Sequence, residues 1–320
     1  MSDNRDFHEK SYKSHAEHYK DYVPGGEKEK HSKTWLETDT VDAWRHKRMY
    51  SALDSILKVE PDAKWLTVGD GRYGTDANYI LKNGGDAVAS DITDSLLMEA
   101  QAAGFITTFS MENAESLSFE NAQFDYVLCK EAFHHFPRPY IALYEMLRVS
   151  AKGVVLIEPN DSFYPHSFTR YLFISAVRLI LSVFFKRGNN HSFEESGNYV
   201  YTISKRELEK VALGMNYRTI AFKGYNDYYQ YGVEFEKLSS RGNIFRKIRH
   251  RILLLDMLAK LNLIDYGMLA GIIFKQKPSA KLIDNLRRDG FDMIDLPENP
   301  HFTCSSPLMT KDRSRNEDIA

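Results

Sequence analysis

The 320-residue chain has little cysteine, no long apolar run and no excess of charge of one sign. Its two cysteines, Cys129 and Cys304, are too few for the disulfide framework of a secreted protein, so a reducing cytoplasm fits best. Lys and Arg number 42 against 44 Asp and Glu, and this net charge of −2 gives no support to a polyanion binder acting over its whole surface, while a local patch stays open. With 43% hydrophobic and 27% charged residues, the composition is that of a globular protein.

Targeting and membrane-spanning patterns are missing as well. Residues 1–6 lack the apolar core of a signal peptide. The most apolar run, residues 171–185, is shorter than the roughly 20 residues that a spanning helix needs, and Arg178 interrupts it. We therefore expect a cytoplasmic protein without a transmembrane segment. The apolar run then packs as a covering helix or lies on a membrane interface, so peripheral membrane contact stays open.

Short apolar segments alternate with helical patterns up to Pro159. Strands are predicted at 65–68, 87–90, 105–109, 124–129 and 154–157, and helices at 41–59, 78–82, 95–103 and 139–149. This alternation predicts βαβ units and a parallel sheet with right-handed crossovers.

The alternation changes after Pro159. Helices are predicted at 163–186, 204–213 and 234–261, and strands at 217–223 and 268–274. Ser204 and Glu207 form the capping-box pattern that starts a helix. Residues 278–320 are predicted to be a C-terminal extension that is partly disordered.

Residues 1–40 are polar. Tyr12, His15, Tyr19 and Tyr22 recur three or four residues apart, which is the spacing of one helical face. Two interpretations stay open for this segment: a partly ordered leader, or a lid that folds over a ligand.

A glycine-rich turn, residues 68–74, lies between the first predicted strand and a helix. Glycine permits positive φ and lets a ligand approach the backbone, and the helix N-terminus presents unpaired N–H groups. Asp91 ends the next strand, at the place where an acid accepts both hydroxyls of an adenosine ribose. The pattern predicts a nucleoside-containing cofactor, and the alternative is a tight turn with a surface aspartate.

Several segments resemble class I S-adenosylmethionine-dependent methyltransferases of the type 11-like domain. The segments occur in the family's order at 68–74, 113–119, 124–129, 134–136 and 151–157. The resemblance covers residues 65–160 and implies an α/β fold: a Rossmann-like sheet of seven mostly parallel strands with an antiparallel last strand. We place the methyltransferase domain at 41–277, with helical insertions near 162–197 and 226–264.

The resemblance implies S-adenosylmethionine as the cofactor. It assigns Gly69, Asp70 and Gly71 to the methionine moiety, Asp91 to the ribose, Ile92, Asn113 and Ala114 to the adenine, and the backbone of Lys130 to the sulfonium. Thr67 departs from the family pattern, which has an acid there for the cofactor's amino group, and Asp70 is the candidate replacement. Tyr73 stands where the family has its third glycine, so the turn is expected to differ locally.

Methyl transfer from a reactive sulfonium needs mainly orientation and proximity from the protein. A hydroxyl or amine acceptor also loses a proton, for which histidine is the natural base. His135 is the preferred candidate, and His134, Glu131 and Glu158 are alternatives. In the structural alternative, the two histidines cap the following helix. No metal site is predicted, and His191, Glu194 and Glu195 are interpreted as a solvated loop.

The segments after the fifth strand are expected to select the acceptor. Tyrosines, asparagines and an aspartate gather at Asn198, Tyr199, Tyr201, Tyr225, Asn226, Asp227, Tyr228, Tyr229 and Tyr231. This set suits a sugar or an aromatic small molecule, or is ordinary structure. The basic run at 241–251 is either a solvated helix face or attracts phosphate on a lipid-linked or nucleotide-linked acceptor. No nucleic-acid-binding module is recognisable.

The leading prediction is a methyltransferase that acts on a small molecule or glycan by O- or N-methylation. An NAD-dependent oxidoreductase shares the glycine turn and the acid, but the segments 113–119 and 134–136 argue against it. A protein that binds the cofactor without turnover is the third alternative, because Thr67 departs from the family pattern.

Overall fold

The computed structural model describes residues 5–161, 172, 175, 192–194 and 198–301. Most of the predicted apolar helix at 163–186 lies outside the described residues, as do His191, Glu195 and residues 302–320.

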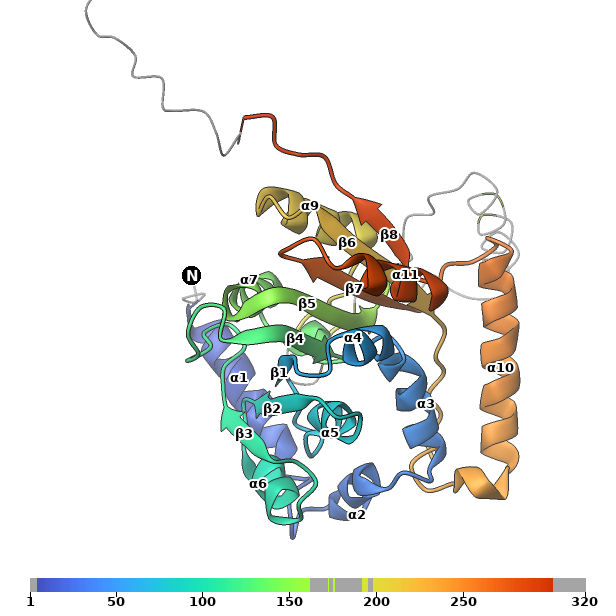
Figure 1. The fold of residues 1–320 in the computed structure, drawn as a ribbon. Helices are drawn as coiled ribbons and strands as arrows, with labels where there is room; N and C mark the ends of the chain where they lie inside the picture. The colour runs from blue at the N-terminus through green and yellow to red at the C-terminus, as the bar shows by residue number, and fades with distance from the viewer. Residues whose placement is uncertain (1–4, 162–171, 173–174, 176–191, 195–197, 302–320) are drawn as a thin grey trace, which may run out of the picture.

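Eight strands form one mixed sheet in the order β3-β2-β1-β4-β5-β7-β6-β8 (Figure 1). The strands are β1 (Lys64–Val68), β2 (Asp86–Asp91), β3 (Thr108–Met111), β4 (Phe124–Lys130), β5 (Ser150–Pro159), β6 (Thr219–Tyr225), β7 (Met268–Phe274) and β8 (Asp292–Asp295). The pairs among β1 to β5 are parallel, whereas β7 is antiparallel to β5 and β6, and β8 is antiparallel to β6. The mostly parallel Rossmann-like fold is confirmed, but the predicted number of seven strands is wrong by one.

The eighth strand explains that difference. β8 has only four residues, two of them aspartates, and it pairs with the edge of β6. A short polar edge strand has no apolar alternation to reveal it, because neither of its faces is fully buried.

The helices are α1 (Arg5–Tyr19), α2 (Glu29–Lys33), α3 (Val41–Tyr50), α4 (Asp54–Val59), α5 (Thr75–Lys82), α6 (Ser95–Ala102), α7 (Pro139–Val149), α9 (Lys205–Gly214), α10 (Asn243–Lys260) and α11 (Ala280–Arg288). Three short 3-10 turns are η1 (Thr34–Leu36), η2 (Phe133–His135) and η3 (Leu238–Ser240). The single helix predicted at 41–59 is two helices, α3 and α4. The capping box at Ser204 and Glu207 is confirmed.

The core has two layers, one on each face of the sheet. Trp65 of β1 packs in the layer that contains α4, α5, α6 and α11, while the next residue, Leu66, packs in the layer that contains α7 and α9. This alternation follows from the two-residue period of a strand. Because both faces of the parallel strands are covered, their carboxyl ends at Val68, Asp91 and Lys130 provide the edge where a ligand can enter.

Candidate cofactor and active site

A cavity of about 280 Å³ lies at this edge. Ligand pockets typically enclose about 300–1,000 Å³, so the cavity has the size of a small-molecule site. The predicted site residues that line it are Gly69, Asp70, Asp91, Ile92, Ala114, Lys130, Glu131, His134 and His135. Gly71 and Asn113 are outside the lining. Asn113 instead accepts a hydrogen bond from the Glu115 N–H at 2.9 Å through its side-chain oxygen.

The glycines let the turn approach its neighbours closely. Gly69 has φ +77°, and a Cβ there would collide with Ala132. A Cβ on Gly71 would lie 2.8 Å from Oδ2 of Asp91, so this carboxylate rests against the turn only because residue 71 is glycine. Asp91 Oδ1 accepts hydrogen bonds from the N–H and hydroxyl of Thr93 at 3.0 and 3.1 Å. Burial raises the pKa of Asp91 to about 6.

The third glycine position of the turn carries a tyrosine in left-handed geometry. Tyr73 has φ +59° and Gly74 has φ +66°. Tyr73 is fully buried, and its hydroxyl donates to Glu99 at 3.0 Å, which compensates for an unfavourable backbone conformation.

Asp70 stabilises the turn itself. Its carboxylate accepts hydrogen bonds from the Thr67 hydroxyl at 2.8 Å and from the N–H groups of Asp76 and Ala77 at 3.1 and 2.9 Å. Burial, together with the charge of Asp76, raises its pKa well above the ordinary value. The carboxylate of Asp70 therefore caps the start of α5, and Thr67 is its partner.

His134 is fixed by a buried carboxylate. Its Nδ1 lies 2.6 Å from Oε2 of Glu158, and the other oxygen of Glu158 accepts from the N–H groups of Ala132 and Phe133 at 2.9 Å each. Glu158 is fully buried, and these contacts hold the η2 turn on the end of β5. Burial acts to lower the pKa of His134, but the Glu158 carboxylate outweighs it and the pKa is raised.

His135 is oriented by a different glutamate. Its Nδ1 contacts Oε1 of Glu194, and its ring centroid lies 5.6 Å from that of His15. The backbone carbonyl of His135 accepts from the Asn198 amide at 2.7 Å, and Asn198 in turn accepts from the Ser11 hydroxyl. Among the described residues, the polar contact to the His135 ring is at Nδ1, which leaves Nε2 for a ligand.

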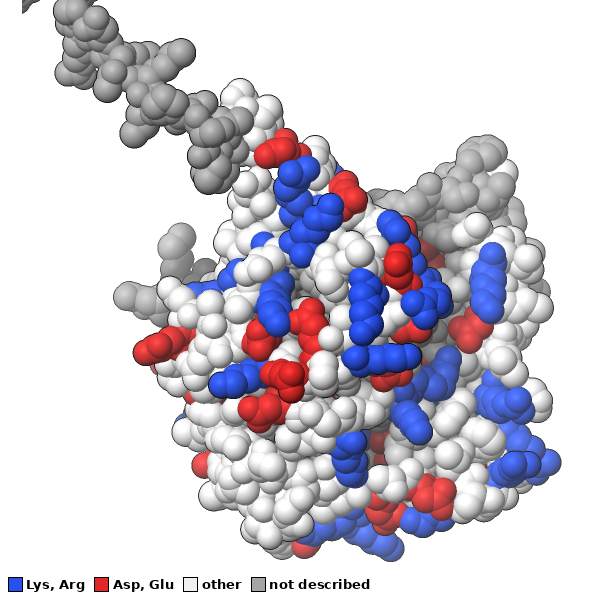
Figure 2. Space-filling model, in the orientation of Figure 1, with Lys and Arg blue, Asp and Glu red and all other residues white. Residues whose placement is uncertain are grey.

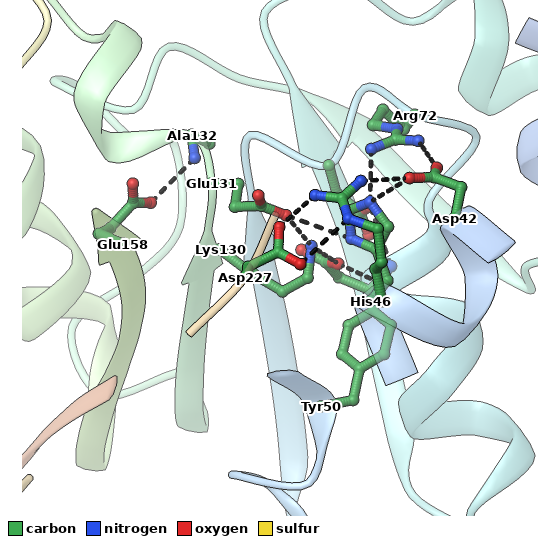
Figure 3. Close-up of polar contacts among 12 residues, drawn as sticks. Asp42, His46, Tyr50, Arg72, Lys130, Glu131, Ala132, Glu158 and Asp227 are labelled. Atoms are coloured by element: carbon green, nitrogen blue, oxygen red, sulfur yellow. Dashed lines mark hydrogen bonds and ion pairs between the residues drawn. The ribbon is translucent and has the colours of Figure 1, made fainter. Parts of the chain in front are cut away.

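Glu131 belongs to a network of ion pairs on the other side of the cavity (Figure 3). Its Oε2 lies 3.2 Å from Nδ1 of His46 and 3.1 Å from Nζ of Lys130. Nε2 of His46 lies 2.8 Å from Arg72, which pairs with Asp42 at 2.7 Å. Burial alone would raise the pKa of Glu131, but Lys130 and His46 hold it well below the ordinary value.

Helix α1 brings three side chains to the cavity. Tyr12, His15 and Tyr19 line it. Burial, followed by the charge of Asp91, raises the pKa of Tyr19 above its ordinary value. Three of the four residues that repeat along the N-terminal segment are thus part of the cavity wall, whereas Tyr22 stacks on Trp35.

The predicted cluster of tyrosines and amides is divided between two places. Asn198 lines the cavity, and the N–H of Tyr201 donates to the His134 carbonyl at 3.4 Å. Asp227 pairs instead with Arg45 of α3. Asn226 donates to Asp256 of α10 at 2.9 Å.

Sequence reasoning missed several groups at the cavity. Glu112 lines it just after β3. Glu194, interpreted from the sequence as part of a solvated loop, contacts the His135 ring across 59 residues. The sequence gives no local signal for such long-range pairs. Within the described residues, no group of three or more His, Cys, Asp or Glu is arranged to hold a metal ion.

Residues 66–157 match the family model described as a methyltransferase domain. The chain therefore contains a methyltransferase domain. Among solved structures, a S-adenosylmethionine-dependent methyltransferase from Archaeoglobus fulgidus is 13% identical, with 72% of this chain and 94% of that chain covered and a TM-score of 0.44. Magnesium protoporphyrin IX methyltransferase from Synechocystis, with bound S-adenosylhomocysteine, is 12% identical, with 72% and 84% covered and a TM-score of 0.42. No curated protein matches the sequence.

The residues present fit S-adenosylmethionine as the cofactor of the methyltransferase domain. A Cβ at Gly69 or Gly71 would fill the space beside the turn, and Asp91 presents a buried carboxylate next to it. The part of the chain that the structure describes contains no helix with the length and apolar character to cross a bilayer.

Proposed function

We propose that the enzyme transfers a methyl group from S-adenosylmethionine to a hydroxyl or amine of a small molecule or glycan, with His135 as the general base. The observation that carries the proposal is the convergence of two features on one cavity. The glycine turn with Asp91 offers a site for the cofactor, and His135, whose ring contacts Glu194, lines the same cavity.

The cofactor supplies an electrophilic methyl group when it is bound. Asp91 would accept hydrogen bonds from its ribose hydroxyls, and Ile92 and Ala114 would contact the adenine. The backbone of residues 69–71 would follow the methionine part. Nζ of Lys130 is engaged by Asp76 and Glu131 at 3.4 and 3.1 Å, so the contribution of this residue to the ligand is its backbone.

Among the candidate bases, His135 has the best combination of contacts. Glu158 is enclosed by two backbone N–H groups and His134, and the pKa of Glu131 is held low by Lys130 and His46. The pKa of His134 is raised by Glu158, which favours the protonated imidazole. His135 has Nδ1 fixed by a carboxylate and Nε2 left to take a proton, which is the arrangement of an oriented general base.

The size and cover of the cavity favour a small acceptor or the end of a glycan. The space is about 280 Å³ and is partly walled by α1, which leaves no open groove for a nucleic-acid duplex within the described cavity. Tyr199 and Tyr201, whose ring centroids lie 5.1 Å apart, follow Asn198, which lines the cavity, and we assign them to the acceptor side.

Cofactor binding can be tested by calorimetry with S-adenosylmethionine and S-adenosylhomocysteine. Gly71→Ala forces a Cβ against Asp91, so affinity should fall by at least about tenfold, corresponding to about 1.4 kcal/mol. Gly214→Ala is the matched control, because a Cβ at Gly214 meets nothing within 4 Å. If both variants bind the cofactor as the wild type does, the proposal that it binds at the glycine turn and Asp91 is wrong.

Turnover can be tested with methyl-labelled cofactor and fractionated small molecules and glycans from source cells. His135→Asn should lower the rate of label transfer by about a hundredfold or more while the cofactor affinity is retained. His250→Asn, at an exposed histidine on α10, is the control and should transfer label normally. Tight cofactor binding with no transfer to any fraction would support a protein without turnover. An unchanged rate in His135→Asn would remove His135 from the role of base.

A further inference from the structure

Helix α10 stands at the edge of the molecule, with only one face packed on the body (Figure 1). Ile248 and Ile252 are buried against Val41 of α3 and Val233. The opposite face carries large apolar side chains in solvent: Leu253, Leu254, Met257 and, just after the helix, Leu261 are 52%, 51%, 51% and 62% exposed. Because Leu253, Met257 and Leu261 are four residues apart, they form one stripe. We call these four residues the α10 apolar stripe.

The exposed charges of α10 are all of one sign. Its exposed ionisable residues are Arg246, Lys247, Arg249, His250, Arg251 and Lys260. The one acid of the helix, Asp256, is directed toward the body, where it accepts from Asn226 at 2.9 Å and lies 3.6 Å from Arg48. Figure 2 shows Lys and Arg side chains gathered along the lower part of this edge, below a white surface. A chain of net charge −2 thus carries a local basic patch beside an apolar stripe.

We propose that α10 binds the surface of an anionic lipid bilayer, with the α10 apolar stripe among the acyl chains and the basic residues at the headgroup phosphates. An amphipathic helix with a basic polar region binds an anionic interface through these two contributions. The proposal is independent of the acceptor, because α10 residues do not line the cofactor cavity.

The charge pattern favours a lipid surface over the other occupants of an apolar face. A second copy docked through the same helix would bring two sets of like charges together. A nucleic acid would be attracted to the arginines, but it offers nothing for four adjacent apolar side chains. An anionic bilayer satisfies both the charges and the stripe.

The test is co-sedimentation of the full-length protein with vesicles. Vesicles of phosphatidylcholine with about one-third phosphatidylserine should retain at least about tenfold more protein than pure phosphatidylcholine, and added salt should reduce the difference. Arg246→Gln/Lys247→Gln/Arg249→Gln should abolish that preference. The triple variant Lys205→Gln/Arg206→Gln/Lys210→Gln removes the same charge from exposed positions of α9 and should bind as the wild type does.

The apolar contribution is tested separately by Leu253→Glu/Leu254→Glu. These side chains are half exposed, so the fold should survive, as judged by circular dichroism and cofactor binding. Binding to anionic vesicles should fall by at least about tenfold. Met98→Glu, at an equally exposed position of α6, is the matched control.

The proposal would be overturned if the α9 triple variant lost as much binding as the α10 triple variant, or if neutral vesicles retained the protein equally. It would also be overturned if Leu253→Glu/Leu254→Glu left vesicle binding unchanged. A wild-type dimer that the same double substitution dissociates, with no binding to either kind of vesicle, would assign the stripe to a second copy instead.

Discussion

Two histidine–glutamate pairs, each with one member in the wall of the cofactor cavity, lie in opposite electrostatic surroundings. On the α3 side, His46 meets Glu131 within a network that also contains Lys130 and Arg72. On the η2 side, His134 meets Glu158, and the largest charge effects on its ring come from carboxylates. Burial and the two cations lower the pKa of His46, whereas Glu158 overcomes burial and raises that of His134. A histidine–glutamate pair is therefore not by itself a base, since the neighbouring charges decide its protonation.

The largest predicted effect is on the free energy of unfolding, when Glu158 and Glu131 are replaced in separate variants. Glu158→Ala leaves two buried N–H groups and His134 without their acceptor, so we expect a loss of about 3–5 kcal/mol in the free energy of unfolding. Glu131→Ala should cost only about 1 kcal/mol, because its side chain is 26% exposed and Lys130 retains Asp76. Urea unfolding measures both values. Glu158→Gln keeps one acceptor oxygen and should be intermediate, and equal losses for the two alanine variants would contradict the distinction.

Asp91 extends the comparison to a carboxylate whose pKa is set by burial. Because its pKa is raised to about 6, protonation below that pH removes the acceptor that we assign to the ribose. Cofactor affinity should therefore fall as the pH drops through about 6, by up to about tenfold per pH unit. Asp91→Asn should bind weakly and lose this pH dependence, as measured by calorimetry between pH 5 and pH 8. The same slope in the variant would mean that another group titrates.

The smallest predicted effects are the shifts in the pKa values of His134 and His46, which NMR can follow directly. His134 should titrate above the ordinary value of 6.5 and His46 below it. The stability from His134 is fully present below pH 6.5 and is lost as the pH rises through its raised pKa. The contribution of His46 to stability has the opposite pH dependence. As the pH drops, the unfolded chain binds this proton at a higher pH than the folded protein does, so stability falls below pH 6.5. Glu158→Gln should lower the pKa of His134, and Lys130→Met should raise that of His46. No movement in either variant would refute the proposed causes.

The features that could be predicted from the sequence are those carried by short segments. The glycine turn, the acid at Asp91 and the alternating strands each depend on a few adjacent residues whose geometry is local. The capping box at Ser204 and Glu207 is of the same kind.

Partners that meet across long distances could not be predicted. Glu194 lies 59 residues from His135, and Asn198 lies 187 residues from Ser11. For Asp70, the sequence predicts the position of the residue but not the role of its side chain. Its place between two glycines suggests a ligand contact, but only the structure shows its carboxylate bound to the first turn of α5. The sequence pattern places a residue near a site without giving the direction of its side chain.

The amide of Asn198 couples the cover of the cavity to its chemistry. Its oxygen accepts from Ser11 of α1, and its nitrogen donates to the carbonyl of His135. One side chain thus joins the N-terminal helix to the backbone of the residue that we propose as the base. If α1 leaves the body when the cofactor is exchanged, the Ser11–Asn198 bond has to break or the His135 backbone has to shift with it.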